Sequence, residues 1–83
     1  MDAERTFSMN KETSISTIIE FSAYGKHGYK KRLERIFSTH SIETVGDLLR
    51  TGRLNFRNFD EVGPGTLSRT DEALEELFNI ISW

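Results

Sequence analysis

The segment from Leu67 to Ile81 carries the strongest structural signal in this chain of 83 residues. Its apolar side chains recur mostly three or four positions apart, the spacing that gives an α-helix one apolar stripe. The predicted stripe consists of Leu67, Thr70, Leu74, Leu77, Phe78 and Ile81. Asp71 and Glu72 are expected near the N-terminal end, where the helix dipole favours acidic side chains. We predict that this segment forms the longest helix of the chain.

The tripeptide Gly63-Pro64-Gly65 stands directly before this helix. It predicts a tight turn, because glycine adopts positive φ freely and proline fixes φ near a helical value. The first turn of a helix presents unpaired backbone N–H groups at the positive end of its dipole, a geometry that accepts a phosphate or another anion. The turn is therefore a candidate binding feature.

Two further helices are expected in the first half of the chain. Residues 14–22 place Ile15, Ile18 and Ile19 at helical spacing, although their β-branched side chains would also suit a strand. A loop is predicted at residues 24–28, because glycines interrupt the pattern there. Residues 29–39 then form a basic amphipathic helix. Its apolar face consists of Tyr29, Leu33, Ile36 and Phe37, and its cations are Lys30, Lys31, Arg32 and Arg35.

A compact helix with both ends specified comes next. Thr44 followed by Asp47 resembles a capping box, and Gly52 supplies a C-terminal stop. Between this helix and the Gly-Pro-Gly turn, the chain has room for no more than one helical turn. Its aromatic residues, Phe56 and Phe59, are expected to anchor that turn in the core.

These patterns predict an all-α protein, a compact bundle of four to five short helices. Residues 1–13 mix charged and hydroxyl side chains without a sustained period and are expected to form a flexible N-terminal tail. Residues 14–83 are expected to form a single helical domain. Two positions for Trp83 stay open, because it could fold back onto the core or cover an apolar groove.

The composition argues against several classes of protein. No cysteine is present, which removes disulfides, thiolate zinc sites and a cysteine nucleophile. His27 and His40 lie in separate segments without metal-ligand spacing, and no nucleophile–base pair is evident. The chain lacks both an apolar run long enough to span a bilayer and a signal-peptide pattern. We therefore expect a soluble, cytoplasmic, non-enzymatic protein with no metal, cofactor, small-molecule substrate or membrane partner.

Charge is divided unevenly along the chain. Residues 22–57 hold eight basic and three acidic side chains, a net charge of +5, whereas residues 58–83 hold one basic and six acidic side chains, a net charge of −5. A polyanion would therefore contact one face only. The alternative is that the two blocks compensate each other across the fold.

Two segments of the chain occur in the same order and spacing in a known family. Residues 42–49 read Ile-Glu-Thr-Val-Gly-Asp-Leu-Leu, and residues 62–67 read Val-Gly-Pro-Gly-Thr-Leu before an acidic helix. They are similar to an Ile-x-Thr-Val-Gly-Asp-Leu segment and a Gly-Lys-Lys-Ser-Leu turn in the C-terminal domain of the bacterial RNA polymerase alpha subunit. The run from about Arg32 to Leu77 thus resembles that domain, which implies a helix-hairpin-helix within the bundle.

The resemblance implies binding to double-stranded DNA, commonly in an A·T-rich minor groove, and contacts with transcription proteins. The family's DNA-contacting arginine falls on Arg32, its turn glycine on Gly63 and its turn hydroxyl on Thr66. An arginine can enter a narrow minor groove while the glycine turn and the threonine N–H and hydroxyl approach a phosphate. The candidate DNA-binding residues are Lys31, Arg32, Arg35, Gly63, Gly65, Thr66 and Arg69.

The chain departs from the family at the turn, where Pro64 and Gly65 replace two lysines. This loss weakens phosphate binding, because that term scales with the number of phosphates neutralised. Lys30, Lys31 and Arg35 could compensate. Two functions stay open: DNA binding in transcription, which we favour, and protein–protein interaction on the same fold after loss of DNA binding, which the acidic last helix favours.

Overall fold

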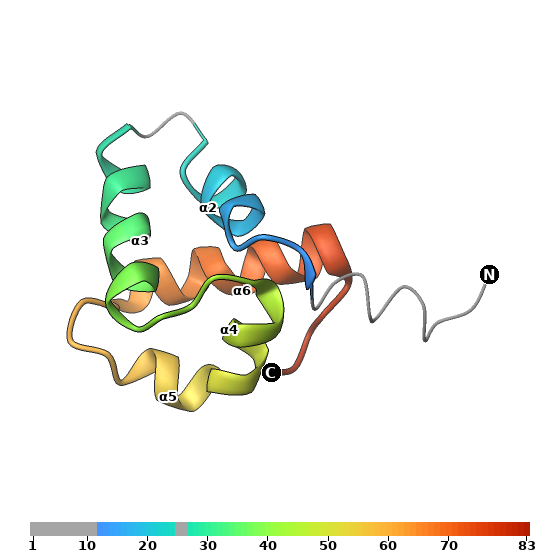
Figure 1. Ribbon diagram of the computed structural model, residues 1–83. Helices are drawn as coiled ribbons and strands as arrows, with labels where there is room; N and C mark the ends of the chain where they lie inside the picture. The colour runs from blue at the N-terminus through green and yellow to red at the C-terminus, as the bar shows by residue number, and fades with distance from the viewer. Residues whose placement is uncertain (1–11, 25–26) are drawn as a thin grey trace.

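The computed structural model describes residues 12–24 and 27–83, and its regular structure there consists of five helices (Figure 1). The helices are α2 (Ser16–Ser22), α3 (His27–Thr39), α4 (Val45–Thr51), α5 (Arg53–Arg57) and α6 (Pro64–Phe78). Within the described ranges, β-type pairing is limited to an isolated bridge between Ser14 and Thr44. The predicted all-α class and number of helices are confirmed.

The longest helix, α6, runs behind the others across the middle of the molecule (Figure 1). The α2 helix contacts both α6 and α3, and α5 contacts both α4 and α6. The core between these helices includes the fully buried Ile18, Leu33, Ile36, Phe37, Val45, Leu48, Phe56 and Leu74. Burial of each such side chain contributes about 1.5–3 kcal/mol, so this apolar core supplies the main favourable term in folding.

The start of α6 differs from the sequence prediction. Pro64 is its first residue, a position where the missing N–H of proline costs nothing, because that N–H would have no partner in the helix. Gly63 precedes the helix at φ −94°, and Gly65 lies in the first helical turn. The expected positive φ in this turn is therefore wrong. Among the described glycines, positive φ occurs at Gly52, with φ 84°, between α4 and α5.

The end of α6 also differs. Asn79 adopts the left-handed conformation at φ 58° and caps the helix, so Ile81 lies beyond it. Leu77 is 40% exposed and Ile81 is 77% exposed, and neither belongs to the buried stripe as predicted. Asp71 lies in the middle of the helix, whose first turn contains no acidic residue. The predicted interaction of Asp71 with the helix dipole is therefore wrong.

The predicted ends of α4 are confirmed. The backbone N–H of Asp47 donates to Thr44 Oγ1 at 3.0 Å, and the N–H of Thr44 donates to Asp47 Oδ2 at 3.2 Å, which forms the reciprocal capping box. A further hydrogen bond from the backbone N–H of Glu43 is the main cause that lowers the pKa of Asp47. Gly52 ends the helix, with its N–H bonded to the carbonyl of Leu48.

The structure bears on two predicted boundaries near the N-terminus. Thr13, predicted to lie in the flexible tail, accepts a hydrogen bond from the N–H of Val45 at 2.8 Å. Residues 1–11 of that predicted tail lie outside the described part of the chain. The α3 helix begins at His27, so His27 and Gly28 belong to this helix rather than to the predicted loop. Residues 25 and 26 of that loop also lie outside the described ranges.

Trp83 folds back onto the core, which resolves the alternative that the sequence left open. Its ring lies 5.6 Å from the Phe56 ring, and its carbonyl oxygen accepts a hydrogen bond from the N–H of Arg53 at 3.0 Å. The indole Nε1 donates to Asp71 Oδ1 at 2.9 Å. Asp71 also accepts from Arg53 Nε at 3.0 Å and Nη2 at 2.8 Å. The C-terminal segment is thus held to both α5 and α6.

We expect Asp71→Asn to lower the free energy of unfolding by about 1 kcal/mol at pH 7, because charge-assisted bonds to a part-exposed carboxylate are lost. The hydrogen bond from Arg53, followed by that from Trp83, holds the pKa of Asp71 below its ordinary value. Since the folded-state pKa is below the unfolded-state pKa, this stabilisation is complete above the unfolded-state pKa and is lost as pH falls through the folded-state pKa.

Urea denaturation at pH 7 and at about pH 2 measures this effect, since the difference between wild type and Asp71→Asn should vanish at the lower pH. Glu72→Gln, an exposed change on the same helix, is the matched control and should leave stability nearly unchanged. An equal deficit for Asp71→Asn at both pH values would contradict the assigned ion pair.

Candidate nucleic-acid interface

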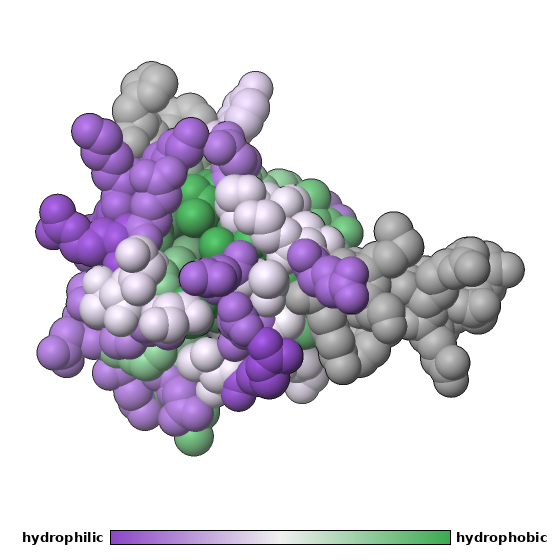
Figure 2. All heavy atoms as spheres, viewed as in Figure 1, coloured by the Kyte–Doolittle hydropathy of each residue, from purple (hydrophilic) through white to green (hydrophobic). Residues whose placement is uncertain are grey.

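The α3 helix has two distinct faces. Leu33 and Ile36 are buried against the core, whereas the cations Lys31, Arg32 and Arg35 are exposed. Figure 2 shows hydrophilic side chains gathered over this helix, at the left of the view. The three cations lie within one helical turn of each other, because positions three and four apart share a helix face. The predicted basic amphipathic helix is therefore present.

These three cations line a hollow of about 450 Å³ on the protein surface. Gly28 and Ile36 of α3 and Glu61 of the α5–α6 connection complete its lining. The guanidinium Nη2 of Arg32 donates to the carbonyl oxygen of Glu61 at 3.4 Å. This hydrogen bond brings the arginine to the segment that leads directly into Gly63. We call this site, lined by Lys31, Arg32, Arg35 and Glu61, the cationic hollow.

The turn before α6 is open to solvent at its glycines. A Cβ atom built on Gly63 or on Gly65 would meet no atom within 4 Å, so another molecule can approach the backbone closely there. No side chain caps the N-terminus of α6. Thr66 differs, because it is only 4% exposed. Its hydroxyl therefore offers little surface to a phosphate, and the predicted anion contact is left to the backbone around the two glycines.

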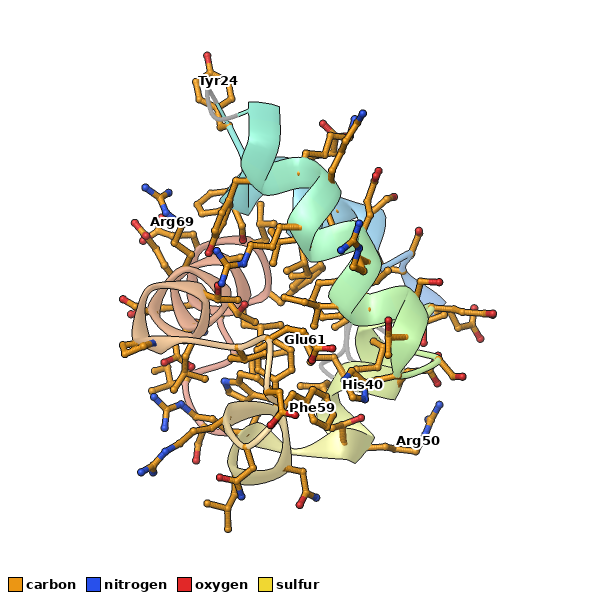
Figure 3. All side chains as sticks on the ribbon, turned by 90° about the vertical axis from the view of Figure 1, so that its left-hand side faces the viewer. Tyr24, His40, Arg50, Phe59, Glu61 and Arg69 are labelled. Atoms are coloured by element: carbon orange, nitrogen blue, oxygen red, sulfur yellow. The ribbon has the colours of Figure 1, made fainter. Side chains whose placement is uncertain are left out.

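Arg69 lies apart from the cationic hollow. Its guanidinium Nη1 donates to the carbonyl of Ser22 at 3.4 Å, and its Cζ lies 5.8 Å from the centre of the Tyr29 ring. The hydroxyl of Ser22 donates in return to the carbonyl of Arg69 at 3.4 Å. Figure 3 shows Arg69 well away from Glu61. Its contacts thus join α6 to α2 and α3, and it is not among the residues that line the cationic hollow.

The structure revises the set of cations expected at the DNA-binding site in two places. Lys30 forms an ion pair with Glu20 at 3.0 Å, and this contact raises the pKa of Lys30. Its charge is thus compensated by α2. Arg57 was not predicted, yet this exposed residue lines a small hollow with Gly63 and Pro64. A cation at the end of a short helix just before a glycine turn was the signal that could have identified it.

Sequence reasoning also missed an acidic group in the cationic hollow. Glu61 Oε1 lies 3.3 Å from Nε2 of His40, whose ring stacks on Phe59 with centroids 3.5 Å apart and an interplanar angle of 4°. Glu61 accepts a hydrogen bond from its own backbone N–H, which is the main cause that lowers the pKa of this carboxyl, and the contact with His40 lowers it further. The three side chains point toward one another in Figure 3.

Comparisons of the chain with models of protein families, with characterised proteins and with solved structures gave no match. The likeness to the RNA polymerase alpha C-terminal domain therefore stays a prediction that rests on the two sequence segments. Residues 12–24 and 27–83 contain no helix long and apolar enough to cross a membrane. In the same residues, no cluster of three or more histidine or acidic side chains is placed to hold a metal ion.

Proposed function

We propose that this protein is a small, non-enzymatic module that binds double-stranded DNA through the cationic hollow on α3 and the turn before α6. The hydrogen bond from Arg32 to the carbonyl of Glu61 carries the proposal, because it joins the basic helix to the segment that leads into the Gly63 turn. Lys31 and Arg35 supply further charge, and each phosphate that such cations neutralise releases counterions and strengthens binding.

Recognition of DNA shape and backbone fits this surface. An arginine beside an open glycine turn suits insertion into a narrow minor groove, with the turn on an adjacent phosphate. The helix-hairpin-helix interpretation assigns this role to Arg32 and Gly63, and the resemblance to the polymerase domain favours a role in transcription. Arg57 beside the same turn supports phosphate contact and offsets the absence of lysines at positions 64 and 65.

An NMR titration of labelled protein with a short A·T-rich duplex tests the proposal. We expect shifts of the backbone amides in residues 31–35 and 61–66, except at Pro64, which has no N–H. These shifts should fade as salt rises from about 50 mM to about 200 mM, because counterion release drives the binding. A G·C-rich duplex of equal length is the control for groove shape. Unchanged amides in both segments at low salt, with the fold intact, would exclude DNA binding by this surface.

A second candidate function is the binding of a protein partner by the acidic side of the molecule. The exposed outer side of α6 carries Glu72, Glu75 and Glu76. Beside it lies a groove of about 720 Å³, lined in part by the exposed Leu54 and Ile81. This combination suits a partner with basic and apolar side chains. The same NMR experiment separates the candidates, because DNA should leave the amides of this side unshifted.

A further inference from the structure

A negative charge lies in the surface that the proposed function assigns to DNA. The carboxylate of Glu61 belongs to the lining of the cationic hollow, and its side chain is 38% exposed. Its backbone carbonyl holds Arg32, whereas its carboxylate contacts His40. A phosphate that approaches the hollow therefore meets three cations and one anion. Whether this anion is compensated by a neighbouring charge affects the affinity of the site.

His40 is placed to supply that compensation. Its imidazole Nε2 lies 3.3 Å from the Glu61 carboxylate, and its ring lies parallel to the Phe59 ring at 3.5 Å (Figure 3). The imidazole thus faces the Glu61 carboxylate on one side and the Phe59 ring on another. Histidine is also the side chain that ordinarily gains its charge in the physiological pH range.

We propose that Glu61 and His40 form a proton-operated gate on the cationic hollow. With neutral His40, the Glu61 carboxylate opposes the phosphates of DNA. With protonated His40, the positive charge beside Glu61 cancels that opposition. DNA affinity therefore rises as pH falls from about 8 to about 6, across the range in which histidine titrates. This inference rests on the proposed function, because it describes regulation of the same surface.

The groups that surround the His40–Glu61 pair come from α3 and from the α5–α6 connection. The α3 helix supplies three cations that stay charged, and Phe59 is not titratable. The Glu61 carboxylate is ionised throughout this range, because its pKa is held below its ordinary value. The charged and titratable groups that line the hollow or contact its Glu61 carboxylate are Lys31, Arg32, Arg35, His40 and Glu61.

Fluorescence anisotropy with a labelled A·T-rich duplex, at constant ionic strength, tests the gate at about pH 8 and about pH 6. Wild type should bind about threefold to tenfold more tightly at the lower pH, the effect of one unit charge about 8 Å from a phosphate at an effective dielectric constant of about 40. Glu61→Gln should bind more tightly than wild type at about pH 8, by a similar factor, because the opposing charge is gone. His40→Gln should bind weakly at both.

His27→Gln, which changes the other histidine of the chain, is the matched control and should keep the wild-type pH response. Equal pH dependence in wild type and His40→Gln would overturn the gate while leaving DNA binding intact. Absence of binding by every variant at both pH values would instead overturn the proposed function, and the gate with it. If His40→Gln does not fold, the comparison between wild type and Glu61→Gln at about pH 8 decides the question alone, because equal affinities there would overturn the gate.

Discussion

Replacement of Phe56 by alanine lowers the free energy of unfolding by about 3–5 kcal/mol, because it removes a fully buried aromatic ring and leaves a cavity. The ring stacks on Phe37 with centroids 5.8 Å apart and meets the edge of Phe59 at 5.8 Å. Trp83 covers it from the C-terminal segment at 5.6 Å. Phe56 thus joins α3, α5 and the end of the chain, and few atoms can move to fill the space.

Chemical denaturation followed by fluorescence measures this loss, since the only tryptophan of the chain, Trp83, lies against the mutated ring. Leu54→Ala is the matched control, because Leu54 lies on the same short helix but is 67% exposed, and it should change stability by no more than about 0.5 kcal/mol. Phe56→Leu provides an intermediate variant if the alanine variant unfolds. Similar losses for Phe56→Ala and Leu54→Ala would show that α5 does not anchor the core as described.

Features that depend on neighbouring residues could be predicted from the sequence. The capping box at Thr44 and Asp47 was one, because the two hydrogen bonds that define it join residues three positions apart. The buried face of α3, with Leu33 and Ile36, was another, because helical periodicity alone selects it. Gly52 was recognised as a stop, and its positive φ explains why glycine suits that position.

Features that depend on packing could not be predicted in the same way. The apolar pattern continues to Ile81, yet the helix ends where Asn79 adopts the left-handed conformation. The pattern therefore extends beyond the end of the helix. The Gly-Pro-Gly sequence suggested positive φ, whereas Pro64 is compatible with the first helical position and takes it. The position of Trp83 depends on Asp71 and on the core aromatic cluster, which no local pattern reveals.

The candidate site also combines features that the sequence predicts with features that depend on packing. Resemblance to a known family selected Arg32 and Gly63, but the hydrogen bond that joins Arg32 to Glu61 spans 29 positions and depends on how α3 packs against the α5–α6 connection. The burial of Thr66 and the contacts of Arg69 with α2 also arise from packing. Local chemistry thus identified the cations, and only the fold determines which of them meet.

The largest expected effect on DNA binding comes from Arg32→Ala. We expect affinity for an A·T-rich duplex to fall by about tenfold or more, because an arginine in a narrow minor groove contributes about 1–3 kcal/mol through charge and hydrogen bonds. The slope of log affinity against log salt should become shallower by about one unit, the signature of one lost phosphate contact. Anisotropy titrations at several salt concentrations measure both quantities.

Two further variants separate the effect of the position of Arg32 on DNA affinity from the effect of its charge. Arg50→Ala removes an equal charge from α4, where Arg50 pairs with Asp47 and points away from Glu61 in Figure 3, so screening should limit its effect to about twofold at 0.1 M salt. Arg32→Lys should restore the salt slope but only part of the affinity, because lysine lacks the planar donor fork of arginine. Equal losses for Arg32→Ala and Arg50→Ala would mean that DNA is attracted by overall charge, and that the hollow on α3 is not the contact surface.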